Sequence, residues 1–330
     1  MIKTRLGSSE LKVSQLAFGC WAVGGGGNWG PQDDRASIEA VQTALDVGMN
    51  FFDTAEAYSS GESERILARG LGSRRDEAFI ASKVSSGHYE PNVLRESCER
   101  SLRNLKSDRI DLYQIHWYPT DTAISEAIGM LTTLIDEGKI RSYGVCNFGR
   151  QQLAEFLTAE GMPTTNQVAY SLLFRAVEAE IRPATEKAGM GILAYSPINQ
   201  GLLGGKVRTL ADVPKERQRT RHYSSTNSTA SHGEEGHEDL TFETVRRIRS
   251  VCQQIDRPMN EVALRWLLDR GGVTSVLIGG RNGDQVRRNA AAASDPLSPD
   301  TLQALDEATG ELKDSMGPNA DLWQSESRIR

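Results

Sequence analysis

The chain has 330 residues and a net charge of −6, with 38 Lys and Arg against 44 Asp and Glu, and 38% of its residues are hydrophobic. This composition is that of a soluble globular protein. Because no long basic run appears, we expect no nucleic acid partner. No apolar run reaches the 18 residues of a membrane span, so we expect no membrane partner either.

The cysteines and the first residues bear on the compartment. Cys20, Cys98, Cys146 and Cys252 are scattered without a CxxC pair, which argues against a disulfide framework and against a zinc site. Residues 1–5 lack the apolar core of a signal peptide, as such peptides are usually recognised. We therefore predict a reducing compartment and a cytoplasmic location.

Short apolar segments alternate with longer amphipathic ones along most of the chain. A hairpin of residues 4–7 and 11–14 is expected first. The predicted strands are 15–19, 50–53, 78–82, 110–116, 140–145, 166–169, 191–195 and 275–278. The predicted helices are 33–47, 62–71, 92–105, 122–137, 151–160, 178–188, 242–254, 260–269, 284–293 and 298–309.

Eight strands that alternate with helices require a parallel sheet, which could be a closed barrel or an open doubly wound sheet. We favour the barrel because polar side chains stand at the ends of successive strands. The prediction is one domain, residues 1–330, with an α/β (β/α)8 TIM-barrel fold, an N-terminal β-hairpin and a long loop after strand 7. That loop, 201–240, is polar, and such loops are lids, binding loops or disordered segments.

The polar groups at the strand ends are chemically complementary. Asp53 ends one strand and Tyr58 follows it, while Lys83 and His116 end the next two strands. A barrel would gather all four at its mouth. An ammonium beside a phenol lowers the pKa of that phenol, so Lys83, held by Asp53, would make Tyr58 a better acid. A neutral His116 could donate a hydrogen bond to a carbonyl, so the set suits protonation of an oxygen while hydride reaches carbon.

Each of these residues alone is more often structural than catalytic, and one different chemistry stays open. Lys83 could form a Schiff base in a barrel isomerase or lyase. The four groups together favour the acid–base interpretation, because they share one predicted rim.

Two other motifs are weaker. Residues 25–30 fit GxGxxG, the dinucleotide-binding pattern. Bulky Trp29 interrupts it, and Asp33 and Asp34 at the following helix would repel a pyrophosphate, so we expect a loop in which Trp21 and Trp29 form substrate walls. His232 and His237 with nearby acids resemble a metal site, but a solvated loop without metal is expected there.

The sequence resembles the aldo-keto reductases over nearly its whole length. The resemblance rests on residues 48–55 with Tyr58, on 82–84, 108–117, 138–141 and 144–148, in the order and spacing of that family. It implies that Tyr58 is the proton donor, that Lys83 and Asp53 tune it, and that His116 orients the substrate carbonyl. Trp117, beside His116, would form part of the pocket wall.

The resemblance also implies NADPH, with NADH as an alternative, bound extended across the barrel mouth. Asn147 and Gln167 would hold the carboxamide, Tyr195 would stack on the nicotinamide, and the loop 196–203 would follow the pyrophosphate. The 2′-phosphate would meet Arg281 and its neighbouring glycines. The implied cofactor-binding residues are Trp21, Asn147, Gln167, Tyr195, Ser196, Pro197, Gln200, Gly201, Leu203, Gly279, Arg281, Gln285 and Asn289.

Two positions depart from the family pattern. Cys146 stands where the family usually has Ser, and Ile278 where it often has Pro.

Two functions remain open. The implied activity is reduction of an aldehyde or ketone, with sugar-derived carbonyls favoured by the polar rim. The alternative is a regulatory subunit that binds the cofactor and turns over slowly or not at all. The sequence does not define the oligomeric state.

Overall fold

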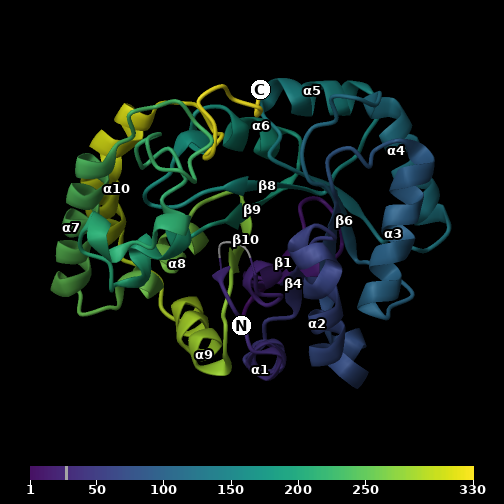
Figure 1. Ribbon diagram of the computed structural model, residues 1–330, viewed down its shortest axis with the longest axis horizontal. Helices are drawn as coiled ribbons and strands as arrows, with labels where there is room; N and C mark the ends of the chain where they lie inside the picture. The colour runs from purple at the N-terminus through teal and green to yellow at the C-terminus, as the bar shows by residue number, and fades with distance from the viewer. Residues whose placement is uncertain (27–28) are drawn as a thin grey trace.

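Eight parallel strands close into a barrel in the computed structural model, which describes residues 1–26 and 29–330. The helices surround these strands in Figure 1. The strands, each hydrogen-bonded to the next in a closed ring, are β3 (Leu16–Gly19), β4 (Phe51–Asp53), β5 (Phe79–Val84), β6 (Leu112–Ile115), β7 (Tyr143–Cys146), β8 (Thr165–Ala169), β9 (Gly191–Tyr195) and β10 (Val273–Ile278). The predicted (β/α)8 barrel is therefore confirmed, and the long connection after its seventh strand, β9, is present.

The N-terminal hairpin closes one end of the barrel. Its strands β1 (Lys3–Arg5) and β2 (Lys12–Ser14) pair antiparallel, as predicted. Leu6 and Val13 are fully buried and pack with the inward side chains of the barrel strands, among them Phe51 and Leu112. Because this end is filled by apolar side chains, a small molecule can enter the barrel only from the other end.

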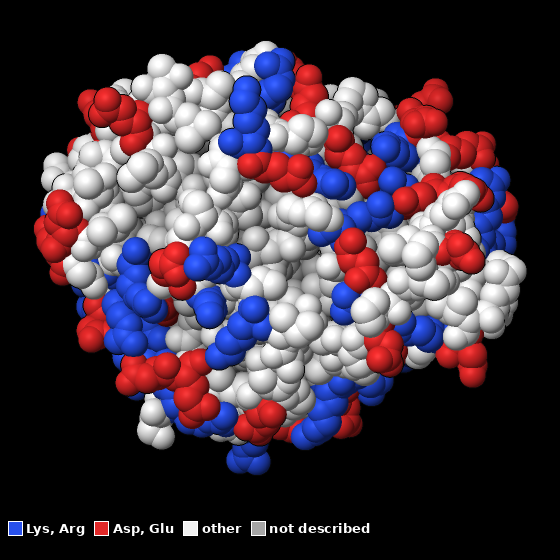
Figure 2. Space-filling view, turned by 180° about the vertical axis from the view of Figure 1, so that it is seen from behind, with Lys and Arg blue, Asp and Glu red and all other residues white. Residues whose placement is uncertain are grey.

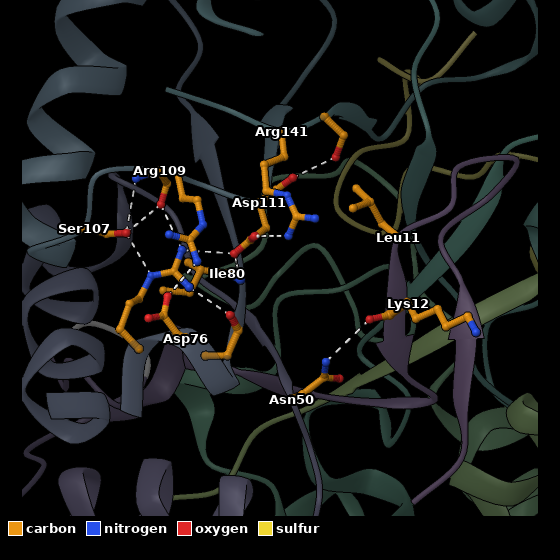
Figure 3. A network of polar contacts seen from close by, with 12 residues as sticks. Leu11, Lys12, Asn50, Asp76, Ile80, Ser107, Arg109, Asp111 and Arg141 are labelled. Atoms are coloured by element: carbon orange, nitrogen blue, oxygen red, sulfur yellow. Dashed lines mark hydrogen bonds and ion pairs between the residues drawn. The ribbon is translucent and has the colours of Figure 1, made fainter. Parts of the chain in front are cut away.

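A polar network secures the same closed end (Figure 3). Asp111 accepts hydrogen bonds from Arg141, at 2.8 Å, from Arg75, at 3.0 Å, and from the backbone N–H of Ile80, at 2.9 Å. A cavity of about 610 Å³ adjoins this network. Arg109, which lines it, is paired with Asp76 at 2.7 Å. Most of the charged side chains here are paired with a charge of the opposite sign. We infer that they link the N-terminal ends of β5, β6 and β7.

Ten helices flank the strands in the described part of the chain. They are α1 (Asp34–Asp46), α2 (Glu62–Leu71), α3 (Pro91–Leu105), α4 (Ile124–Asp136), α5 (Arg150–Thr158), α6 (Ile181–Lys187), α7 (Glu238–Gln254), α8 (Met259–Leu268), α9 (Gly283–Ala290) and α10 (Pro299–Met316). Most bounds agree with the prediction within a few residues. Asp33 caps α1 by accepting a hydrogen bond from the N–H of Ala36 at 2.8 Å, a usual N-terminal signal.

Three helices depart from their predicted bounds. α6 begins at Ile181 after a short 3-10 turn, and α7 begins at Glu238, four residues before the prediction. α10 runs to Met316 rather than 309 because Leu312 and Met316 continue its buried face. α10 and α7 pack side by side (Figure 1).

The segment 199–237, between β9 and α7, packs against the barrel mouth. It contains three 3-10 turns, η6 (Asn199–Gly204), η7 (Leu210–Asp212) and η8 (Lys215–Arg217). His222 is fully buried and lies 2.9 Å from the carbonyl of Leu173. The expectation of a solvated loop is wrong for His232, which is buried and lies 3.1 Å from the carbonyl of Thr220. Because the loop buries these histidines, it is a packed wall of the barrel mouth and not a solvated segment.

The C-terminal tail, 317–330, is tied to that loop and to α5. Arg221 in the loop is 4% exposed, and its guanidinium donates to the carbonyls of Met316 and Asn319 at 3.0 and 2.9 Å and to Glu234 at 2.7 Å. At the far end of the tail, the carbonyl of Arg330 accepts hydrogen bonds from the first turn of α5, next to which the C label lies in Figure 1. Loop and tail therefore form one layer over the mouth.

The face shown in Figure 2 has no large patch of a single charge sign, because acidic and basic side chains are intermingled on it. Among the described residues, no helix has both the length and the apolarity that a membrane crossing requires. Nor does this part of the chain bring three or more His, Cys, Asp or Glu side chains together as a metal site.

Candidate active site

A cavity of about 770 Å³ opens at the carboxyl ends of the barrel strands. Active sites of this fold lie at that face. Its walls combine the ends of β3, β4, β7, β8, β9 and β10 with the loop 199–237 and the tail. Most of the predicted site residues line it: Trp21, Trp29, Asp53, Tyr58, His116, Trp117, Asn147, Gln167, Tyr195, Ser196, Pro197, Gln200, Gly201, Gly279, Arg281 and Gln285.

The predicted acid–base group is assembled around a buried ammonium. Lys83 is fully buried on β5, and its Nζ donates to Asp53 Oδ1 at 2.6 Å, to the carbonyl of Thr54 at 2.7 Å and to Tyr58 Oη at 3.2 Å. These three acceptors satisfy the three donors of an ammonium. The register of the barrel makes this possible, because β4 and β5 are neighbours with Asp53 opposite Ala81.

Two amides hold the second oxygen of Asp53. Gln114 Nε2 donates to Asp53 Oδ2 at 3.2 Å, and Gln167 Nε2 donates to the same oxygen at 2.8 Å. Gln114 was not predicted as a site residue. A glutamine in the otherwise apolar stretch Leu112–Ile115, whose neighbour across the sheet is Lys83, is the sequence signal that could have found it.

The pKa of Tyr58 departs from its ordinary value in the direction opposite to our expectation. Burial raises the pKa of Tyr58 to about 12, and the charge of Lys83 opposes that rise only in part. Lys83 lowers the pKa of Tyr58, as expected, but desolvation of the buried phenol outweighs this effect, so the net shift is upward. At neutral pH the phenol therefore keeps its proton and can donate it.

The protonation states of Lys83 and His116 follow from the same burial. Burial alone would lower the pKa of the Lys83 ammonium, but the charge and hydrogen bond of Asp53, together with smaller contributions from Tyr58 and Cys146, outweigh it and the pKa of Lys83 is raised. Burial, with the charge of Lys83 acting in the same direction, lowers the pKa of His116 to about 3. His116 is thus neutral, as the sequence interpretation required, and its ring lies edge-on to Tyr58 with centroids 6.1 Å apart.

Asn147 and Tyr195 are locked to each other beside this group. Tyr195 Oη donates to Asn147 Oδ1 at 2.9 Å, and Asn147 Nδ2 donates to the carbonyl of His116 at 3.1 Å. Asn147 has a φ of +60°, a conformation that asparagine tolerates better than most residues. Gln167 gives its N–H groups to Asp53 and Gln114, so its carbonyl oxygen remains for a ligand amide.

The loop after β9 has the conformation of a ligand cradle. Ser196, Gln200 and Gly201 have φ values of +53°, +54° and +104°. The buried Nε2 of Gln200 has no hydrogen-bond partner among the described residues, an unsatisfied donor that suits a phosphate or other acceptor. Leu203 differs from the prediction, since its side chain is buried in the hydrophobic core and does not line the cavity.

The turn before α9 requires glycine because neighbouring protein atoms leave little room for a Cβ. A Cβ on Gly279 would lie 3.1 Å from the carbonyl oxygen of Gly19, and one on Gly280 only 2.8 Å from Val286. Asn289 Nδ2 donates to the carbonyl of Gly279 at 3.1 Å, so it supports this turn and does not line the cavity. The unsatisfied Gln200 and the two glycines line the same cavity, an arrangement that fits an extended phosphate-bearing cofactor.

Arg281 lies directly before Asn282, the N-cap of α9, and lines the cavity. Its Nε donates to Gln32 Oε1 at 2.6 Å, and its guanidinium also contacts the carbonyl of Pro31. The backbone N–H of Arg281 donates to Gln285 Oε1 at 2.9 Å. A guanidinium at a helix N-terminus is suited to a phosphate.

Three tryptophans line the remaining wall. The Trp21 ring stacks against Tyr58 with centroids 6.0 Å apart, and Trp29 meets Trp21 edge-on at 5.4 Å. The guanidinium of Arg328 lies over the Trp117 ring at 3.8 Å. The GxGxxG pattern falls in this region, and its residues 27 and 28 lie outside the described part of the chain. The strand before it belongs to the closed barrel, so a doubly wound dinucleotide fold is excluded.

The sequence analysis missed the residues that the loop and the tail contribute to the cavity. Arg217, Arg219, Trp323, Gln324 and Arg328 all line it. They lie far from the strand ends in sequence, so no strand-end pattern marks them. The tryptophan in an otherwise polar tail was the one visible signal.

The fold and this site define a (β/α)8-barrel enzyme. The sequence model described as the Aldo/keto reductase family matches residues 15–309, and the chain belongs to that family. It is thus an NAD(P)H-dependent oxidoreductase, as the resemblance implied.

Individual proteins agree with this assignment. The chain is 30% identical over 323 residues to the NADH-specific methylglyoxal reductase of Escherichia coli (strain K12). The alignment covers 90% of this chain and 95% of that relative. It resembles the structure of the glycerol dehydrogenase from Gluconobacter oxydans, with a TM-score of 0.80, 28% identity and coverage of 94% and 95% of the two chains. An aldo/keto reductase from Klebsiella pneumoniae, in complex with NADP and acetate, matches with a TM-score of 0.73 and 26% identity, covering 92% of this chain and 94% of its own.

Proposed function

We propose that the protein reduces aldehyde or ketone carbonyls, with sugars and sugar-derived compounds as the favoured substrates, to alcohols with NADPH. The observation that carries this proposal is the protonated phenol of Tyr58 at 3.2 Å from the buried Lys83 ammonium, in a cavity of about 770 Å³. A phenol next to a fixed cation can lose its proton to a substrate oxygen at low cost, because the phenolate that forms is stabilised by that cation.

Each residue of the group has a distinct role in this scheme. When bound, the nicotinamide cofactor would supply the hydride that the carbonyl carbon accepts. Tyr58 donates its proton to the carbonyl oxygen, and Lys83, held charged by Asp53, stabilises the resulting phenolate. His116, neutral, donates a hydrogen bond to the same oxygen and orients it. Proton donation by a positioned group contributes about 10²–10⁴ in rate.

The cofactor would be held along the rim by residues of four segments. Asn147 and Gln167 offer amide groups to the carboxamide, and Tyr195 offers a ring face. Gln200 offers its unsatisfied N–H to the diphosphate. Arg281 offers charge to a 2′-phosphate, which favours NADPH over NADH, although the E. coli relative is named NADH-specific.

Titration with NADPH and NADH, followed by tryptophan fluorescence, tests the cofactor part of the proposal. Four tryptophans line the cavity, so binding should change the emission: Trp21, Trp29, Trp117 and Trp323. Turnover of a panel of aldehydes and ketones, followed at the nicotinamide absorbance band, tests the reaction. Tight binding with turnover supports the proposal. Tight binding with no turnover of any carbonyl would favour a regulatory nucleotide-binding subunit.

A further inference from the structure

The charge balance of the main cavity is uneven. The charged side chains of the described residues that line it are Asp53, Arg217, Arg219, Arg281 and Arg328. Asp53 is neutralised by Lys83, and Arg328 is paired with a buried aspartate of the tail, at 2.7 Å. Arg281 is hydrogen-bonded to Gln32. Neither Arg217 nor Arg219 forms an ion pair with a carboxylate of the described residues.

Arg219 is held in the wall by two aromatic rings. Its guanidinium carbon lies 5.2 Å from the centre of the Trp21 ring and 4.7 Å from that of Trp323. Its Nε is buried and has no hydrogen-bond partner in the described part of the chain. Partial burial lowers the pKa of Arg219, because the guanidinium loses part of its hydration and no carboxylate of the described residues pairs with it. Cation–π contacts offset only part of this cost.

The position of Arg219 points to the substrate and not to the cofactor. Trp21, which Arg219 contacts, is itself stacked on Tyr58. Arg217 lies over the neighbouring Trp29 ring at 5.2 Å. Its Nη1 is also 3.7 Å from the position of a Cβ on Gly201, in the loop that we propose follows the cofactor diphosphate. The proposed cofactor therefore accounts for Arg217 and leaves Arg219 without a partner.

We propose that the substrate carries an anionic group, a carboxylate or a phosphate, at a distance from its carbonyl, and that Arg219 binds that group between Trp21 and Trp323. This inference rests on the proposed carbonyl reduction and names its substrate class. An arginine stacked on aromatic rings keeps its N–H groups free for a two-point contact with an anion. The anion would accept hydrogen bonds from the guanidinium and fix the far end of the substrate while the carbonyl faces Tyr58.

Matched aldehydes that differ in charge test this inference. Glyceraldehyde 3-phosphate is compared with glyceraldehyde, and 4-oxobutanoate with butanal. An effect of the variant on the phosphate pair alone indicates a phosphate substrate, and an effect on the carboxylate pair alone indicates a carboxylate substrate. The variants are Arg219→Gln, Arg219→Lys and, as a control, Arg208→Gln, which removes a charge from an exposed position of the same loop.

We expect Arg219→Gln to lower kcat/KM for the anionic aldehyde by about 10–100-fold, the worth of one charge-assisted hydrogen bond. The loss should lie mainly in KM, because Arg219 does not touch the reacting atoms. The neutral aldehyde and the NADPH dissociation constant should be unchanged, Arg219→Lys should restore part of the loss, and Arg208→Gln should behave as the wild type.

Two results would overturn the inference. One is an equal loss for charged and neutral aldehydes in Arg219→Gln, and the other is a loss explained by weaker NADPH binding. If the wild type reduces no aldehyde, the proposed function fails, and the inference is judged by binding alone. Glycerol 3-phosphate and succinate are then titrated against glycerol into the NADPH complex by tryptophan fluorescence. Absence of Arg219-dependent binding of both anions refutes it.

Discussion

Lys83 and Asp53 form a 2.6 Å ion pair in which both side chains are almost completely removed from water, at 0% and 3% exposure. An ion pair at this depth stabilises a fold less than its short distance suggests, because both charges lose their hydration. What it provides is a fixed positive charge beside Tyr58, so its removal should affect stability and catalysis together.

Replacement of Asp53 by Asn should leave the Lys83 ammonium buried without a counter-ion. We expect the free energy of unfolding to fall by about 3–5 kcal/mol, measured by urea denaturation, and the double variant with Lys83→Met to recover part of that loss. Asp34→Asn, which breaks an exposed pair with Arg69, serves as the control and should cost less than about 1 kcal/mol. An equally small loss for Asp53→Asn would show that the buried pair is not coupled in this way.

Replacement of Tyr58 by Phe removes the predicted acid and keeps its ring. Carbonyl reduction should fall by about 10²–10⁴-fold, while the NADPH dissociation constant stays as in the wild type. Tyr118→Phe, which removes a hydroxyl that is bonded to Glu155 outside the cavity, should remain active. Survival of activity within a few-fold in Tyr58→Phe would assign the proton to another donor.

The raised pKa of Tyr58, about 12, predicts how reduction responds to alkaline pH. The acid must be protonated to act, so kcat/KM for reduction should not fall through loss of the Tyr58 proton between about pH 6 and pH 9. Phenolate absorbance of the wild type minus that of Tyr58→Phe measures the ionisation directly. A difference signal that appears below pH 10 would contradict the dominance of burial.

His116 predicts an acid-side loss of stability. Its pKa is about 3 in the folded protein against an ordinary value of 6.5, so between these values the unfolded chain binds a proton that the folded one does not. Stability is therefore fully present above pH 6.5 and is lost as pH falls towards 3. His116→Gln should flatten the slope of unfolding free energy against pH by up to about 1.4 kcal/mol per pH unit. Identical slopes in both proteins would show that His116 titrates normally.

Arg281→Ala should weaken the binding of NADPH much more than the binding of NADH. Loss of a charge-assisted contact to the 2′-phosphate predicts an NADPH dissociation constant about 10–100-fold higher, with NADH little affected. Arg287→Ala, which breaks an exposed pair with Asp284 on the same helix, is the matched control. If both nucleotides weaken equally in Arg281→Ala, the residue supports the turn and not the phosphate.

The strand ends could be predicted from sequence because each is a local event. Asp53, Lys83 and His116 follow short apolar runs, and parallel strands bring such positions to one mouth whatever the loops do. The direction of the Tyr58 pKa could not be predicted, since it depends on how completely the hydroxyl is buried. The same limit applies to Gln114, whose contact with Asp53 depends on the barrel register.

The loop and the tail could not be predicted because their contacts join distant parts of the chain. His232 was expected in water because its neighbours in sequence are polar, yet its hydrogen bond to Thr220 lies inside the packed loop. Arg219, Trp21 and Trp323 come from three separate segments. No periodic sequence pattern predicts that their side chains are in contact.

The bonds of Arg221 to the tail have a consequence for engineering. Its guanidinium supplies hydrogen bonds to carbonyls of residues about a hundred positions away, and buried carbonyls without donors are costly. A loop transplanted from another barrel without this arginine would leave the tail unsupported, and a new tail would leave the arginine without acceptors. A design that replaces one of the segments 199–237 and 317–330 should therefore replace both together, while the barrel strands and the Lys83 group are kept.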